Sequence, residues 1–128
     1  MALSMSASIL VVDDQQVAAA VTQSILVRLG FTNTDAVNSA ADAIEKIRHR
    51  RYDLVFCDWH MPQTDGPELF RQIKLTAGSK RPKFYFLTGD SRWGCMVTAR
   101  DLGADGLLIK PQRPAELMQR ISQTLYLQ

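Results

Sequence analysis

Five polar residues stand where short apolar runs of the sequence stop. A short apolar run bounded by turn signals is typical of a strand buried on both faces, as in a parallel sheet covered by helices. The carboxyl ends of parallel strands meet at one edge of the sheet, where ligands bind in open α/β folds, so we expect the five side chains to share one pocket. They are Asp13 and Asp14 after residues 9–12, Asp58 after residues 54–57, Thr88 after residues 84–87 and Lys110 after residues 107–109.

Three carboxylates in one pocket pose an electrostatic problem. Carboxylates within a few ångströms of one another repel, and the pKa of each rises unless a positive charge lies nearby. Lys110 supplies one such charge, and a hard divalent cation with oxygen ligands, for which Mg2+ is the usual cellular choice, would supply another. A carboxylate beside a metal, an ammonium and a hydroxyl is suited to accept a phosphoryl group as a nucleophile. The residue types therefore predict phosphoryl-accepting chemistry.

The chain alternates apolar runs with amphipathic segments five times, which predicts five strand–helix units. The first amphipathic segment has Val17, Val21, Ile25 and Leu29 at a spacing of four, and we expect one face of this helix to pack on the sheet. Ala18, Thr22 and Leu26 lie beside that row. We expect strands at residues 9–12, within 31–37, and at 54–57, 84–87 and 107–109, and helices at residues 15–29, from the cap Ser39 through Ile47, and at about 67–77, 91–102 and 114–126.

Crossovers of this length require parallel strands, because each helix must carry the chain back across a face of the sheet. The predicted fold class is therefore α/β, a doubly wound five-stranded parallel sheet flanked by helices on both faces. The 128 residues have an ordinary globular composition, 46% apolar and 22% charged, without a linker, repeat or low-complexity tract. We expect one domain over residues 1–128, with a short flexible N-terminus at about residues 1–7.

The charge and cysteine content argue against several functions. A net charge of +2 is too small for a nucleic-acid-binding surface. The one basic run, residues 48–51, falls at the expected end of a helix, and we interpret it as complementing the helix dipole rather than as a phosphate-binding patch. Two cysteines are too few for a disulfide framework, and no segment resembles a membrane span or a signal peptide. We expect a cytoplasmic protein that binds neither nucleic acid nor membrane.

Four ordered motifs resemble those of the receiver domain of two-component response regulators, the CheY-like family. They cover almost the whole chain: VVDD at residues 11–14, DWHMPQTDG at 58–66, LTGD at 87–90 and GADGLLIKP at 103–111. The resemblance implies a flavodoxin-like sheet with strand order 2-1-3-4-5. It also implies a phosphorelay signalling protein that is not an enzyme, except for its own Mg2+-dependent phosphorylation and its own dephosphorylation.

The resemblance implies a role for each residue that handles the phosphoryl group. Asp58 is the implied phosphoacceptor, phosphorylated by a histidine kinase or a histidine phosphotransfer protein. Lys110 is implied to pair with this carboxylate and then with the phosphoryl group, and the Lys110–Pro111 bond is expected to be cis. Thr88 is implied to turn its hydroxyl onto the phosphoryl oxygen and to report phosphorylation to the surface. Hydrolysis then resets the switch.

The resemblance also implies a Mg2+ site. Asp14, Asp58 and the main-chain carbonyl of His60 are the implied ligands, and Asp13 completes the acidic site partly through water. Coordination by the His60 ring is disfavoured because the other ligands are hard oxygens. His60 and Asp90, which lies two residues after the threonine, are instead implied to control access of water to phosphorylated Asp58.

Several of these residues also have a simpler structural interpretation. Asp13 or Asp14 alone would cap the following helix, although adjacent acids at a buried strand end favour the site. Thr88 alone would be an ordinary strand-end residue. Asp65 and Gly66 are interpreted as a tight turn rather than as site residues, because both suit turn geometry.

The sequence departs from the family pattern at Leu107, where many receivers carry Tyr or Phe three residues before the lysine. The aromatic switch coupled to the threonine is therefore not assumed here. Leu107, together with Trp93 and Met96, would form an apolar patch on the face built by the fourth helix, the fifth strand and the fifth helix. We expect a downstream protein target to bind there, although Met96 is equally compatible with a core position.

Two classes of function remain. The favoured one is a phosphorylatable single-domain regulator that signals by protein–protein contact. The alternative is a receiver-like interaction module that works without phosphorylation, or a receiver fragment of a longer regulator. An aspartyl phosphatase ranks lower, because the second acid expected two residues after the nucleophile is His60 here. The sequence leaves open the cognate kinase, the target, the oligomeric state and the choice between motor, relay and phosphate-sink roles.

Overall fold

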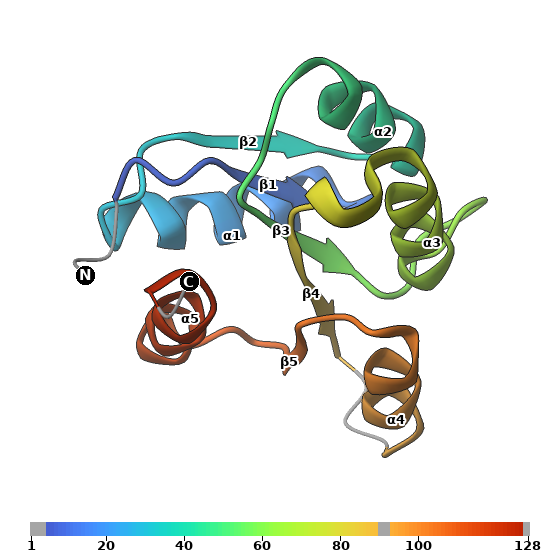
Figure 1. Ribbon diagram of the computed structural model, residues 1–128. Coiled ribbons are helices and arrows are strands. Elements are labelled where there is room, and N and C mark those ends of the chain that lie inside the picture. The colour runs from blue at the N-terminus through green and yellow to red at the C-terminus, as the bar shows by residue number, and fades with distance from the viewer. Residues whose placement is uncertain (1–4, 90–92, 127–128) are drawn as a thin grey trace.

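The computed structural model of the chain has a central sheet covered by helices (Figure 1). The structure describes residues 5–89 and 93–126. The strands are all parallel and lie in the order β2-β1-β3-β4-β5, which confirms the predicted topology. They are β1 (Ile9–Val12), β2 (Thr34–Val37), β3 (Leu54–Asp58), β4 (Lys83–Thr88) and β5 (Gly106–Ile109).

The helices form two layers, one on each face of the sheet. One core cluster joins the sheet to α1 and α5, and the other joins it to α2, α3 and α4. The expected helices are all present, although the last one ends as an α-helix at Ile121 and the expected start at Ser91 lies outside the described residues. They are α1 (Gln16–Arg28), α2 (Ala40–His49), α3 (Gly66–Ala77), α4 (Trp93–Leu102) and α5 (Pro114–Ile121), with a 3-10 turn η1 (Gly78–Lys80) after α3 and a π-helical turn η2 (Ser122–Tyr126) after α5.

Local signals set several of these helix boundaries. The side chain of Ser39 accepts a hydrogen bond of 3.1 Å from the backbone N–H of Asp42, so it caps α2 as predicted. Pro67 and Pro114 occupy the first turns of α3 and α5, where a missing N–H costs nothing. Gly30 follows α1 with a φ of 107°, a conformation that favours glycine at a helix C-terminus.

One face of α1 packs on the sheet as predicted, but the N-terminal part of the Val17-to-Leu29 row does not belong to it. Val17 is 78% exposed and Val21 is 51% exposed, whereas the buried residues of α1 are Ala19, Thr22 and Leu26. Residues four apart on an α-helix are offset by about 40°, so a strict spacing of four winds away from the sheet over three turns. Only the later members of the row, Ile25 and Leu29, pack against the core.

The described part of the N-terminal segment contacts the body of the domain. Ala7 is buried and the main-chain carbonyl of Ser6 accepts a hydrogen bond from Asn33, while residues 1–4 of the segment expected to be flexible lie outside the described residues. Within the residues that the structure describes, none of the helices has the length and apolar character needed to span a membrane.

Candidate functional site

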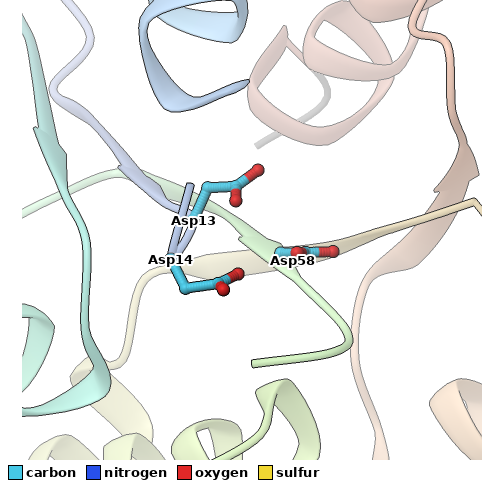
Figure 2. A group of neighbouring side chains, drawn as sticks. All are labelled: Asp13, Asp14 and Asp58. Carbon is cyan, nitrogen blue, oxygen red and sulfur yellow. The ribbon is translucent and has the colours of Figure 1, made fainter. Parts of the chain in front are cut away.

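The carboxylates of Asp13, Asp14 and Asp58 gather at the carboxyl edge of the sheet (Figure 2). One oxygen from each lies within 4.8 Å of the others. The register explains why they meet: Val12 of β1 is paired with Cys57 of β3, so the residues that follow these two positions emerge side by side. The predicted cluster of acidic side chains is therefore present.

Asp13 is the most deeply held of the three, with 1% of its surface exposed. Its Oδ1 accepts a hydrogen bond of 3.0 Å from the backbone N–H of Gln15, the N-cap residue of α1, so Asp13 holds the turn before the helix and is not itself the helix cap. Its Oδ2 lies 3.2 Å from Nζ of Lys110. The amide of Asn38 donates a 3.0 Å hydrogen bond to the Asp13 main-chain carbonyl. Asp13 is thus held by contacts from the residue that follows β5, from the turn before α1 and from the loop after β2.

Lys110 bridges two of the carboxylates. Its Nζ lies 3.2 Å from Asp13 and 3.4 Å from Oδ1 of Asp58. Its backbone N–H donates a 2.7 Å hydrogen bond to the main-chain carbonyl of Thr88, so β4 and β5 bring the buried threonine and the lysine to the same edge. The Lys110–Pro111 peptide bond is cis, as the resemblance implied.

The environment of Asp58 raises its pKa above the ordinary value of 3.8. Burial is the largest cause, because removal from water penalises the charged form. The ammonium of Lys110 opposes the shift, while the neighbouring charges of Asp13 and Asp14 add to it. One lysine therefore does not balance the site, and a further cation would stabilise the ionised carboxylate.

The residue composition of the pocket fits a hard divalent cation. Three carboxylates and one ammonium leave a formal charge of −2, which one divalent cation would neutralise. All three candidate side-chain ligands are carboxylate oxygens, the donors that Mg2+ prefers. Asp13, Asp14 and Asp58 are the side chains that would hold the ion.

The loop after Asp58 returns to the site through Gly66. A Cβ atom built on Gly66 would lie 2.6 Å from the main-chain carbonyl oxygen of Asp58, and the Gly66 N–H donates a 2.9 Å hydrogen bond to Trp59. Asp65 is the N-cap of α3, because its side chain accepts a 2.9 Å hydrogen bond from the backbone N–H of Glu68. The interpretation of Asp65–Gly66 as a tight turn is therefore wrong: the pair starts a helix.

Four further residues that the sequence predicted to contribute to the site or to the partner surface have different outcomes. His60 is exposed, and its main-chain carbonyl stays a predicted ligand. Asp90 and the side chain of Trp93 lie outside the described residues. Leu107 is half-buried and Met96 is 45% exposed, so Met96 is not a core residue.

The face that carries Leu107 and Met96 is less apolar than predicted. Both residues line a cleft of about 400 Å³ that also contains four charged residues of the loop before α5 and of α5 itself. These are Lys110, Arg113, Glu116 and Arg120. The face therefore offers charges of both signs around an apolar centre.

Sequence reasoning missed three residues that support the site. Asn38 bonds the Asp13 carbonyl, Gly66 contacts the Asp58 backbone, and Gln112 donates a 2.7 Å hydrogen bond to the buried hydroxyl of Thr22 in α1. The Asn38 and Gln112 bonds join segments far apart in the chain, whereas Gly66 follows Asp58 after one short loop. No local pattern in the sequence marks such partners, although Gly66 directly before a proline at a helix start was a signal of close backbone packing.

Comparison with known proteins finds similarity over most of the chain. The family model described as the response regulator receiver domain matches residues 9–122. The chain is 26% identical over 119 residues to the chemotaxis protein CheY-3 of Vibrio cholerae, covering 93% of this chain and 92% of that protein. It is 26% identical over 113 residues to the chemotaxis protein CheY of Pseudomonas aeruginosa, covering 88% and 91%.

Solved structures show the same fold. A putative response regulator from Chloroflexus aurantiacus superposes with a TM-score of 0.86 at 25% identity, covering 94% of this chain and 98% of that one. A CheY-like receiver domain protein from Methanospirillum hungatei superposes with a TM-score of 0.83 at 26% identity, covering 94% of each chain. The strand order and helix layers described above are therefore those of an established fold.

Proposed function

This chain belongs to the response regulator receiver domain family, and we propose that it is a phosphorylation-activated switch that accepts a phosphoryl group on Asp58 from a histidine kinase or a histidine phosphotransfer protein. The observation that carries the proposal is the position of Lys110 Nζ, 3.4 Å from Asp58 Oδ1 at the edge of a cluster of three carboxylates. Family membership supports two-component signalling as the general setting.

Asp58 is better placed than Asp13 to act as the nucleophile. The side chain of Asp13 is 2% exposed and both its oxygens accept contacts from protein donors. The side chain of Asp58 is 13% exposed, so an incoming phosphoryl group can reach it.

The proposed step forms one bond and breaks one bond. A carboxylate oxygen of Asp58 attacks the phosphorus of a phosphohistidine, and the electron pair of the P–N bond leaves with the imidazole nitrogen. Mg2+, when bound, neutralises charge on the transferring oxygens. Lys110 follows the charge from the carboxylate to the phosphoryl group, and the hydroxyl of Thr88 donates to a phosphoryl oxygen. Attack of water on the phosphorus later breaks the P–O bond to Asp58, releases inorganic phosphate, returns the carboxylate and resets the switch.

The output of the switch is proposed to be protein–protein contact. The family setting supports partners of two kinds, an upstream phosphodonor protein and a downstream target. We place the target on the α4–β5–α5 face, which includes Trp93 and Leu107 and has a mixed apolar and charged cleft. In this proposal residues 1–128 act as one receiver domain in the cytoplasm.

Intact-mass spectrometry after incubation with acetyl phosphate and Mg2+ tests the proposal. Wild type should gain the mass of one phosphoryl group, and Asp58→Asn should gain none. The matched control is Asp65→Asn, which changes a nearby carboxylate but keeps a capping residue at the start of α3. The control should be phosphorylated like wild type, and removal of Mg2+ by EDTA should prevent phosphorylation of both.

Fluorescence of Trp59 separates metal binding from phosphorylation. This ring is 9% exposed, follows Asp58 directly and packs against Phe86 with ring centroids 4.7 Å apart. In a Trp93→Phe background, Mg2+ should change the fluorescence of wild type, and acetyl phosphate should change it again only when Asp58 is present. Equal mass gain in Asp58→Asn would contradict the proposal by assigning the phosphoryl group to another residue. No gain in wild type with Mg2+ would contradict it as well and would favour an interaction module that works without phosphorylation.

A further inference from the structure

A second cleft lies at the opposite edge of the sheet from Asp58. It has a volume of about 470 Å³ and is bounded by the C-terminal end of α2, the loop before β3, the end of α3 and the turn η1. Ile47, Ala77 and Pro82 contribute apolar surface to it. The residues that give it charge belong to the basic run 48–51 and to Lys80.

The charged residues around this cleft are all basic. None of the described lining residues is an aspartate or a glutamate. Arg50 is already engaged, since it lies 2.6 Å from Asp35 and contacts the Tyr52 ring at 5.0 Å. Arg48, Arg51 and Lys80 are exposed, and the described residues hold no ion-pair partner for them.

Helix dipoles do not account for these cations in full. The run was interpreted from the sequence as complementing the dipole of the preceding helix, whose C-terminal end carries about −0.5 of an elementary charge. The C-terminal ends of α2 and α3 both line the cleft. Their partial negative charges together offset about one positive charge. Three cations without ion-pair partners therefore leave an excess of about two positive charges around an apolar floor.

The arrangement favours several separated negative charges over one compact anion. Phosphate sites in proteins commonly use the positive N-terminal ends of helices, whereas this cleft faces two C-terminal ends. Arg48, Arg51 and Lys80 come from three different segments, α2, the loop before β3 and η1. Spaced carboxylates can reach such cations individually, and an apolar side chain between them can occupy the floor.

We propose that this basic cleft is a docking site for an acidic peptide segment of a partner protein, with Glu or Asp residues on Arg48, Arg51 and Lys80 and an apolar side chain over Ile47, Ala77 and Pro82. The site is separate from the phosphorylation pocket and does not require Asp58. It gives the domain a second protein contact in addition to the α4–β5–α5 face.

NMR titration of the full chain with a defined probe tests this proposal. The probe is a short peptide in which Glu and Asp residues surround a central Leu, and its control replaces the acids by Gln and Asn. The acidic peptide should shift the backbone amides of residues 47–52 and 76–81 selectively, and the neutral one should not. Asp58→Asn should bind the acidic peptide like wild type, so a failure of the phosphorylation proposal would leave this result unchanged.

Charge reversal identifies the residues responsible. Arg48→Glu with Arg51→Glu should weaken binding about tenfold or more, because attractive pairs become repulsive ones. The matched control, Arg28→Glu with Arg100→Glu, makes the same change in net charge and also alters cations in the last turns of helices. It should bind within about twofold of wild type. If the cleft variant does not fold, Arg51→Gln with Lys80→Gln removes the charges more gently and should still weaken binding.

Three results would overturn the proposal. The first is no selective shift with the acidic peptide. The second is equal weakening by the control variant, which would show attraction to net charge alone. The third is stronger binding of inorganic phosphate or ATP at the same amides, which would assign the cleft to a small phosphorylated ligand.

Discussion

Gly66 and Asp58 are in direct backbone contact: a Cβ atom on Gly66 would lie 2.6 Å from the main-chain carbonyl oxygen of Asp58. The first residue of α3 therefore presses against the backbone of the candidate phosphoacceptor. The same Cβ would also lie 3.1 Å from Phe86 and from the Cα of Trp59. Only glycine allows α3 to begin this close to β3, so the loop that follows the site is held at both ends.

Replacement of Gly66 by alanine should destabilise the fold by about 1–3 kcal/mol, because the added methyl group must displace backbone rather than a flexible side chain. Urea unfolding followed by circular dichroism measures this change. Gly94→Ala is the matched control, since a Cβ there meets nothing within 4 Å and lies in a helix. The control should be unchanged or more stable by up to about 1 kcal/mol. Equal behaviour of the two variants would show that the contact relaxes at no cost.

Replacement of Lys110 by alanine should separate metal binding from phosphoryl acceptance. Nζ of Lys110 lies 3.2 Å from Asp13 and 3.4 Å from Asp58, so its charge opposes binding of a cation to these carboxylates. The variant should bind Mg2+ more tightly, by about tenfold, and should be phosphorylated by acetyl phosphate more slowly than wild type. Trp59 fluorescence and intact-mass time courses measure the two effects.

The control for this pair of measurements is Lys46→Ala, which removes one exposed positive charge from α2. It lowers the net charge by the same amount but should leave both the Mg2+ affinity and the phosphorylation rate within about twofold of wild type. If Lys110→Ala weakened Mg2+ binding, the ammonium would be organising the carboxylates rather than competing with the metal.

The raised pKa of Asp58 predicts a pH-dependent stability difference in metal-free buffer. Between the ordinary value of 3.8 and the raised folded-state value, the folded chain binds more protons at this residue than the unfolded chain. The contribution of Asp58 to the free energy of unfolding therefore falls as the pH rises through this interval. Asp58→Asn, which stays uncharged, should be more stable than wild type at neutral pH, and the difference should vanish below pH 3.8.

Urea unfolding at several pH values with EDTA present measures this difference. Asp101→Asn is a suitable control because Asp101 is exposed, with a side-chain exposure of 67%, and it should match wild type throughout. Addition of Mg2+ should stabilise wild type more than Asp58→Asn and so reduce the gap. A gap that stays constant at every pH would show that burial of the Asp58 charge does not cause it.

The strand ends were predictable because a buried parallel strand leaves a strong local signal. Runs such as residues 9–12 and 54–57 are fully buried, and the polar residue that ends each run lies at the same edge of the sheet. The apolar runs and the motifs already implied the strand order and the pairing of Lys110 with Asp58 that the structure shows. The pocket was thus accessible from sequence because chain direction alone determines where parallel strands end.

Contacts between distant segments were not accessible in this way. The basic run was interpreted only from its position at the end of one helix. In the structure Arg50 forms an ion pair with Asp35 on β2. Lys80 of η1 lines the same cleft as the basic run. Asp65 and Gly66 suit a tight turn as well as a helix start, and only the approach of α3 to β3 decides between them. Local propensity depends only on the residue and its sequence neighbours, whereas these contacts depend on which other segment packs against the residue.

The orientation of α1 gives a final prediction that distinguishes packing from spacing. Leu26 is fully buried, and truncation to alanine should cost about 2–5 kcal/mol through lost apolar contact and a cavity. Val17 is 78% exposed, so Val17→Ala should change the free energy of unfolding by no more than about 0.5 kcal/mol, with better helix propensity as the only systematic effect. Urea unfolding compares the two variants directly. A large loss at Val17 would mean that the row with a spacing of four packs on the sheet after all, and it would require α1 to be rotated about its axis.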